Sequence, residues 1–239
     1  MKTLAGHIGD NLFFIDRDYS RTQGLCLLNR APLLAMLHDP ATGHHYFDHF
    51  HRYNSGEWTV TQVQGTGTAA TQDAIGGVLG IVNSGTDDDE TQLQKKGEAF
   101  KLASGKLLWF ETKLYTTTAD DCDLYVGLGI TDTSSIGGAS DGVTFRVTDT
   151  SANVQFVTEK NSTETTTSAI TTLADATYKY LGFIFDGTNV YPYVNGVVGT
   201  AHTTNIPDDE ELCVTFAVRN GSGAAKGLYI DYISVAQVF

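Results

Sequence analysis

The chain is 239 residues long, 41% of its residues are hydrophobic, and its formal net charge is −13. This length supports one substantial core, and β-sandwiches of this size are often a single domain. A chain this acidic repels phosphate, which argues against nucleic acid as a partner. The 25 glycines against only 4 prolines are typical of many short strands joined by glycine turns.

The three cysteines, Cys26, Cys122 and Cys213, are too few for a secreted disulfide scaffold. We therefore expect free thiols, with Cys122 and Cys213 buried in strands. The apolar stretch Leu25–Leu37 is too short and too interrupted to span a bilayer, so no membrane partner is expected. The first twenty residues contain acidic side chains and no apolar secretory core, which favours folding in a reducing cytoplasm.

Two regions follow one another along the chain. Residues 1–52 are irregular and rich in aromatic, histidine, arginine and leucine side chains, which predicts an N-terminal arm. Within this arm, Asn29 and Pro32 could begin a short helix with Leu33–Leu37 as its apolar face, or the same patch could fold back as core. From residue 53 to residue 239, strand and turn signals recur, which predicts a sandwich domain.

The predicted strands show a period of two residues, with apolar side chains on one face. The expected core-facing sets, in chain order, are Leu108, Phe110, Thr112 and Leu114; Leu124, Val126, Leu128 and Ile130; Val143, Phe145 and Val147; Val154 and Phe156; Leu212, Val214, Phe216 and Val218; and Leu228, Ile230 and Tyr232. Strands at this spacing predict an all-β fold in which two antiparallel sheets pack face to face.

The run from Tyr180 to Gly199 predicts strand, turn, strand, turn and strand. Leu181, Phe183 and Phe185 alternate with Tyr180, Gly182 and Ile184, and Asp186-Gly187 and Asn195-Gly196 are hairpin turn pairs. The FDG and YVNG motifs of this run resemble the concanavalin-like (LamG-like) jelly roll. That resemblance implies a jelly-roll β-sandwich, a fold shared by lectins, glycanases and viral structural proteins, and therefore names no function.

The segment from His44 to His51 gathers histidine and aromatic side chains. His45 and His49 would share a face in a helix, and His49 and His51 in a strand, so zinc is conceivable. Four closely placed ligands are normally needed and no cysteine is near, so we favour a contact with the domain or with a neighbouring subunit. The expected contact residues are Leu33, Leu34, His44, His45, Tyr46, Phe47, His49, Phe50 and His51.

Acidic runs occur at Asp87–Glu90, Asp120–Asp123 and Asp208–Glu211. Loop carboxylates are ligands that calcium prefers, and jelly-roll relatives often hold calcium in such loops. None of the runs matches a defined calcium loop, and a solvated acidic loop is the commoner explanation for such a run. No cofactor is expected, with calcium as the open alternative.

Catalytic motifs are missing from the predicted strands. The glycanases of this fold carry alternating carboxylates on one strand, whereas the strand at Cys122–Ile130 has only Asp123 and the strand at Trp109–Tyr115 only Glu111. We therefore expect no enzymatic activity. Aromatic side chains that could stack on sugars are Trp58, Trp109, Tyr115, Tyr125, Tyr191 and Tyr193, although most such rings in a sandwich are core. Tyr191 and Tyr193 share one strand face, which predicts a glycan or subunit face.

Several short motifs, in their order along residues 46–239, resemble tailed-phage virion structural proteins. They are Tyr46–Phe50, Glu57–Thr61, Gly76–Ile81, Asp123–Gly129 and Ile230–Val235. The resemblance implies a virion location and a capsid decoration (cement) protein, made in the host cytoplasm, which clamps major capsid subunits through its arm. Its partners would be the major capsid protein and copies of itself, with a trimer as one arrangement. The alternative is a carbohydrate-binding, lectin-like module of a phage fibre or a host-surface adhesin.

Overall fold

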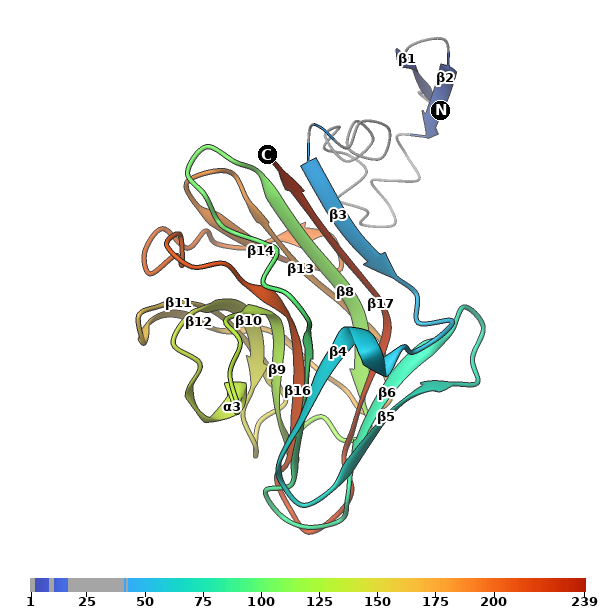
Figure 1. Ribbon diagram of the computed structural model, residues 1–239, viewed down its shortest axis with the longest axis vertical. Helices are drawn as coiled ribbons and strands as arrows, with labels where there is room; N and C mark the ends of the chain where they lie inside the picture. Colours follow the sequence, from blue (N-terminus) through green and yellow to red (C-terminus); the bar gives the residue numbers. More distant parts are fainter. Residues whose placement is uncertain (1–2, 9–10, 17–40, 42) are drawn as a thin grey trace.

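The computed structural model describes residues 3–8, 11–16, 41 and 43–239. Two antiparallel sheets pack face to face as a β-sandwich (Figure 1), which confirms the all-β fold predicted from the sequence. Strands β1 (Thr3–Ile8) and β2 (Asn11–Asp16) form a separate antiparallel pair. Within the described ranges, no helix is long and apolar enough to cross a membrane.

The two sheets of the sandwich contain seven and eight strands. The first has the order β12 (Thr163–Thr172), β11 (Asn153–Lys160), β10 (Gly142–Val147), β9 (Cys122–Gly129), β16 (Cys213–Asn220), β7 (Glu90–Lys95) and β4 (Trp58–Gln64). The second has the order β15 (Val197–Val198), β14 (Val190–Val194), β13 (Lys179–Phe185), β8 (Leu108–Thr116), β17 (Gly227–Val238), β6 (Val78–Asn83) and β5 (Gly67–Gln72), and β3 (Gly43–Asp48) also pairs with β17. Two short helices, η1 (Ser55–Glu57) and α3 (Ser135–Gly138), lie in connections.

The core lies between the sheets and is built from the side chains that the period of two predicts. Phe110 of β8 and Phe183 of β13 stack at 5.0 Å between ring centroids, and Phe145, Phe156 and Phe216 extend this aromatic centre. Cys122 and Cys213 are buried free thiols, as expected. The hairpin turns are also confirmed, since Gly187, Asn195 and Gly196 all have positive φ angles.

Strand β3 joins a segment of the predicted arm to the sandwich. It pairs antiparallel with the C-terminal half of β17, from Asp48 opposite Ile233 to Gly43 opposite Val238. Phe50, just beyond the strand, is fully buried in the main core. The sheet therefore begins within the range 1–52 that the sequence assigns to the arm. The predicted arm helix at Leu33–Leu37 lies outside the described residues.

A β-bulge in β17 corrects one predicted strand face. Ile230 lies opposite Leu114 of β8 and Tyr232 lies opposite Lys113, so Asp231 is an extra residue in β17. A bulge shifts the alternation of side chains by one residue. Ile230 and Ile233 consequently face the core, and Tyr232, which the simple alternation assigns to the core, projects from the outer face of the eight-stranded sheet.

Phe47 and Phe50 provide a matched test of how firmly this N-terminal segment is built into the core. Phe50→Ala removes a fully buried ring and should lower the free energy of unfolding by about 3–5 kcal/mol. Phe47→Ala truncates a ring that is 51% exposed and should lower it by less than about 1 kcal/mol. Urea unfolding followed by tryptophan fluorescence measures both. Equal losses in the two variants would mean that Phe50 is not part of the core.

Candidate functional site

The histidine-rich segment is divided between the two faces of β3. His45 and Phe47 lie opposite Ala236 and Ser234 of β17 and project from the outer face of the sheet. Tyr46 points inward and packs against the core. The predicted contact residues therefore form no single surface; Leu33 and Leu34 lie outside the described residues.

The remaining histidines of the segment lie at the two ends of β3. At one end, the His44 ring stacks against Phe100 and Phe239, with centroid distances of 4.9 and 5.3 Å. At the other, His49 contacts the Tyr232 ring at 5.7 Å and the His51 ring at 5.8 Å. Over the described ranges, no three His, Cys, Asp or Glu side chains are grouped so that they could hold a metal ion.

A buried carboxylate, Glu111 of β8, organises the outer face of the eight-stranded sheet. Its neighbours across the sheet are Gly182 of β13 and Ser234 of β17, which leave room beside it. The Tyr193 hydroxyl reaches over Gly182 and donates to Glu111 Oε2 at 2.9 Å, and the Tyr232 hydroxyl donates to Oε1. A Cβ at position 182 would lie 2.2 Å from Tyr193 Cζ, so only glycine fits there.

This arrangement buries Tyr193, one of the two predicted glycan-face tyrosines. Tyr193 is 1% exposed, and its hydroxyl also donates to the Phe110 carbonyl at 3.2 Å. Tyr191 lies two residues away on the same face, opposite Ile184, and is half-buried. Tyr191 and Tyr193 therefore do share one face of the sheet, but the Tyr193 ring is not accessible to a ligand. Glu111 itself is 4% exposed, and this burial raises the pKa of its carboxyl group.

Near Glu111, seven aromatic side chains lie in two groups on either side of Lys113, and we call this set the aromatic platform. Its members come from β3 and the residue after it, β8, β13 and the preceding turn, and β17: Phe47, His49, Tyr115, Tyr178, Tyr180, Tyr229 and Tyr232. Phe47, Tyr178 and Tyr180 are 51%, 37% and 38% exposed, and the other four are half-buried.

Ring contacts connect the members of the platform. Tyr232 contacts Phe47 at 6.3 Å and Tyr180 at 6.5 Å between centroids. Tyr115 stacks on Tyr229 at 4.7 Å and meets Tyr178 edge to face at 4.8 Å. The rings therefore form two contacting groups, one around Tyr232 and one around Tyr115, and five of the seven lie on strands of the sheet.

Lys113 lies at the centre of the platform. Its ammonium group lies 4.3 Å from the Tyr178 ring centroid and 5.7 Å from that of Tyr180, and it donates to Asp231 Oδ2 at 2.5 Å. Burial alone would lower the pKa of Lys113, but the hydrogen bond and charge of Asp231 raise it above its ordinary value. The bulge residue Asp231 thus keeps a cation in place between two exposed tyrosines.

The outer face of the seven-stranded sheet is closed, in contrast. Gln92 and Gln94 of β7 hold the connection between β9 and β10 through hydrogen bonds to the backbone of Ile130, Asp132 and Ser135. This connection includes α3 and covers Tyr125, which is fully buried. Trp58 and Trp109 are buried too. Of the four side chains outside the hairpin that the sequence offered for stacking on sugars, only Tyr115 is therefore accessible.

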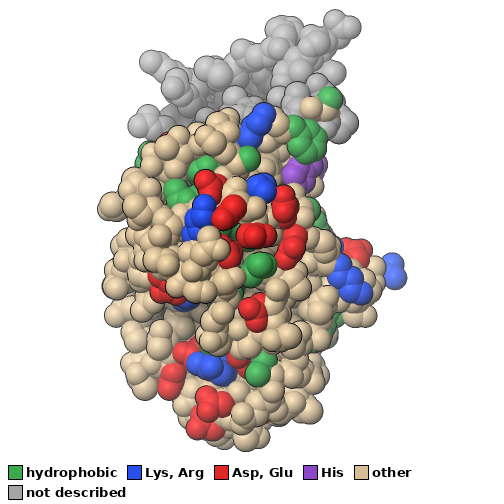
Figure 2. Space-filling view, turned by 60° about the vertical axis from the view of Figure 1, so that its left-hand side comes forward, with side chains coloured by type: hydrophobic (Ala, Val, Ile, Leu, Met, Phe, Trp, Pro, Cys, Tyr) green, Lys and Arg blue, Asp and Glu red, His purple; other side chains and the backbone are tan. Residues whose placement is uncertain are grey.

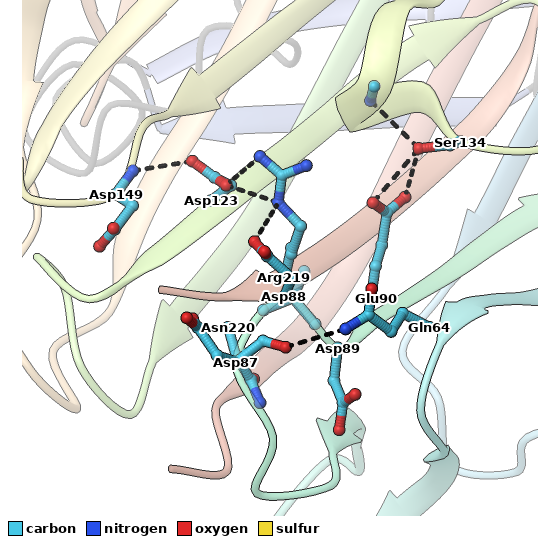
Figure 3. Close-up of polar contacts among 12 residues, drawn as sticks. Gln64, Asp87, Asp88, Asp89, Glu90, Asp123, Ser134, Asp149, Arg219 and Asn220 are labelled. Atoms are coloured by element: carbon cyan, nitrogen blue, oxygen red, sulfur yellow. Dashed lines mark hydrogen bonds and ion pairs between the residues drawn. The ribbon is translucent and has the colours of Figure 1, made fainter. Parts of the chain in front are cut away.

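Carboxylates on the outer face of the seven-stranded sheet form ion pairs and hydrogen bonds with neighbouring residues. Figure 3 shows Arg219 between Asp123 and Glu90, where its guanidinium group binds Asp123 Oδ2, with Nε at 2.7 Å. Asp123 Oδ1 accepts from Asp149 N at 2.7 Å, and both Glu90 oxygens accept from Ser134 Oγ. Burial raises the pKa of Glu90. Asp123 is therefore neutralised by Arg219, and Glu90 is held by a hydroxyl group.

Ion pairing also shapes the surface charge. Figure 2 shows acidic side chains in groups with lysine or arginine among them. On the side of the molecule in this view, hydrophobic side chains lie only in small separate patches. In the predicted calcium run Asp87–Glu90, Asp89 is 1% exposed and accepts from Ser84 Oγ and Thr86 N. Calcium binding therefore stays a prediction, with no three-residue ligand group among the described residues.

Sequence reasoning missed most of the platform. The alternation of Tyr180 with Leu181 and Phe183 already placed Tyr180 away from the core, which was a usable signal. Tyr232 and Asp231 depend on the bulge, and Lys113 on pairing between strands distant in sequence, so no local pattern marked them.

Comparison with solved structures places the fold among the concanavalin-like jelly rolls. A GH16 enzyme from Bacteroides ovatus, solved with a product of mixed linkage glucan, aligns with a TM-score of 0.60 at 12% identity, covering 80% of this chain and 99% of the enzyme. The carbohydrate recognition domain of Emp46p aligns with a TM-score of 0.55 at 10% identity, covering 79% and 93%. At these identities the likeness shows the fold alone.

A family assignment follows from the sequence itself. Residues 74–231 match the model of the SO2946-like C-terminal domain, and the chain belongs to this family. The protein SO2946 from Shewanella oneidensis MR-1, described as of unknown function, aligns with a TM-score of 0.57 at 14% identity, covering 83% of this chain and 87% of that one. No curated protein matches. The predicted jelly roll is thus confirmed, and nothing in these comparisons indicates a phage virion protein.

Glu111 gives a pH-dependent prediction. Because its pKa in the folded protein lies above the usual value of 4.5, its contribution to stability is fully present below pH 4.5 and is lost as the pH rises through the folded pKa. Glutamine does not titrate, so the melting temperature of the wild type minus that of Glu111→Gln should fall as the pH rises above 4.5.

Glu57 is the control, because Lys95 lowers its pKa. Its contribution is present above pH 4.5 and lost as the pH falls, so the corresponding difference for Glu57→Gln should rise with pH. Thermal unfolding by circular dichroism across the pH range measures both slopes. Parallel slopes for the two variants would contradict the assignment of Glu111 as a destabilised buried carboxylate.

Proposed function

We propose that this protein binds carbohydrate, without cleaving it, through the aromatic platform on the outer face of its eight-stranded sheet. The observation that carries the proposal is the set of seven aromatic side chains, in two contacting groups joined by Lys113 of the Lys113–Asp231 pair. Isolated exposed apolar residues are normal on a protein surface, whereas a contiguous group rimmed by polar side chains marks an interaction site.

The chemistry of the platform suits a sugar ring. A pyranose presents C–H groups on its faces and hydroxyl groups around its edge. Tyrosine offers a flat apolar ring with a polar tip, so Tyr178 and Tyr180 can pack against the C–H face and still reach hydroxyls. Lys113 and Asp231 supply a donor and an acceptor between these rings.

The shape of the platform favours a chain of sugars over a single ring. The aromatic side chains extend from Phe47 through Tyr232 and Tyr180, and Lys113 links these to Tyr178 and Tyr115. An open, extended surface of this kind accepts internal segments of a polysaccharide. Each contact is modest, and affinity comes from several rings acting together.

We propose binding without hydrolysis because the carboxylates at the platform are already engaged. Glu111 accepts hydrogen bonds from two tyrosine hydroxyls and is 4% exposed. Asp231 is paired with Lys113. The lectin-like and glucanase neighbours are compatible with a sugar ligand. The capsid-decoration function, with the major capsid protein and further copies of the chain as partners, stays a prediction from short sequence motifs.

Removal of the exposed rings tests the proposal. Tyr178→Ala and Tyr180→Ala should each weaken polysaccharide binding by about 0.5–1.5 kcal/mol, which is about two- to tenfold in Kd, and the double variant by about the sum. Affinity electrophoresis and titration calorimetry against mixed-linkage β-glucan, laminarin, xylan and mannan measure this loss.

Ile75→Ala is the matched control, because Ile75 is a fully exposed apolar side chain that makes none of the ring contacts of the platform. It should bind as the wild type does. Failure of every polysaccharide to bind, or equal binding by the tyrosine variants and the wild type, would refute the proposal. Release of reducing ends by the wild type, lost in Glu111→Gln, would show instead that the protein is a hydrolase.

A further inference from the structure

A second concave site lies at one end of the sandwich, away from the platform. It is a pocket of about 350 Å³ where the loop before β8, the turn between β13 and β14, and the loop before β16 meet. We call it the loop pocket. This volume is at the lower end of the range for small-molecule sites, so it suits one small ring and not a polymer.

Backbone contacts fix the wall of the loop pocket. Gly105 N donates to the Gly187 carbonyl at 2.8 Å, and a Cβ on Gly187 would lie 2.8 Å from Gly105 Cα. Asp186 Oδ1 accepts from the backbone N–H groups of Thr188 and Asn189, which holds the turn. The pocket is therefore formed by constrained backbone and needs no ligand to shape it.

The floor of the loop pocket is apolar, and hydroxyl-bearing side chains line its rim beside the Lys160–Asp208 ion pair. Leu102 and Phe185 are buried at its base. Ser104, Thr188 and Thr203 line its rim, and their hydroxyl groups make no hydrogen bond with any described residue. An apolar floor below several available hydroxyl groups matches a ligand with one C–H face and an edge of hydroxyls.

The charges at the pocket exclude an ionic ligand. Among the described residues, Lys160 is the one cation that lines it, and its ammonium group is already paired with Asp208 and lies 3.4 Å from Asp209 Oδ1. The surplus of carboxylates repels an anion, and a cationic ligand would have to displace Lys160 from this pair.

We propose that the loop pocket is a separate binding site for a single neutral sugar ring, such as a pyranose at the end of a glycan. Thr188 and Thr203 supply hydrogen bonds and Phe185 supplies the apolar contact. This site does not rest on the function proposed for the platform, because the two share no residue.

Solution NMR on the ¹⁵N-labelled full chain tests the site with glucose, galactose, mannose, xylose and N-acetylglucosamine as probes. At least one of them should shift the amide signals of Thr188 and Thr203 saturably, with a Kd on the order of millimolar. Thr188→Trp fills the mouth of the pocket and should abolish the shifts. Thr203→Val removes only a hydroxyl and should weaken binding by about two- to tenfold.

Thr166→Trp, at an exposed position of β12 outside the pocket, should bind as the wild type does. Tyr180→Ala should also retain the shifts, and Thr188→Trp should retain polysaccharide binding, which separates the two sites. The proposal is overturned if no probe shifts these amides, if the shifts persist undiminished in Thr188→Trp, or if glucuronate or glucosamine binds more tightly than every neutral sugar.

Discussion

The extra residue in β17 governs the outer face of the eight-stranded sheet. If Asp231 were paired as an ordinary strand residue, with no bulge, the alternation along β17 would continue unbroken and Tyr232 would point into the core. The bulge brings Tyr232 to the outside, where its hydroxyl binds Glu111, and places the Asp231 carboxylate beside Lys113. Two of the polar contacts on which the aromatic platform depends therefore follow from a single irregularity in one strand, and Gly182 makes room for the third, from Tyr193.

The two sheet faces that point away from the core differ in what they leave accessible. On the seven-stranded sheet, the paired glutamines of β7 hold a loop over the strands, and Arg219 neutralises Asp123. On the eight-stranded sheet, the described residues leave tyrosine rings at the surface. A closed, ion-paired face stabilises the fold, whereas an open aromatic face can exchange water for a ligand. This contrast is the reason for proposing a binding function for the outer face of the eight-stranded sheet.

Much of the fold could be predicted because strand periodicity and turn chemistry are local properties. Leu108, Phe110 and Leu114 share a face for the same reason whatever strand lies beside them, and Asn195-Gly196 turns wherever it occurs. The site could be predicted much less well. Glu111 meets Tyr193 and Tyr232 only through pairing between strands far apart in sequence, and the bulge leaves no mark in the residue pattern. The histidine-rich segment misled for a related reason, because β-pairing separates its neighbours onto opposite faces.

The pairing of β3 with β17 has a consequence for how the protein is made. β3 is the first strand of the sandwich along the chain and β17 is its partner, so Tyr46 and Phe50 have no complete surface to pack on until β17 has left the ribosome. The two segments lie side by side near the C-terminus in Figure 1. Contacts between such distant residues slow folding, because a long loop must close before any of them form. During synthesis β3 and its aromatic side chains therefore stay unpaired and exposed until β17 is available. At this stage the chain is most prone to aggregate and to be bound by chaperones.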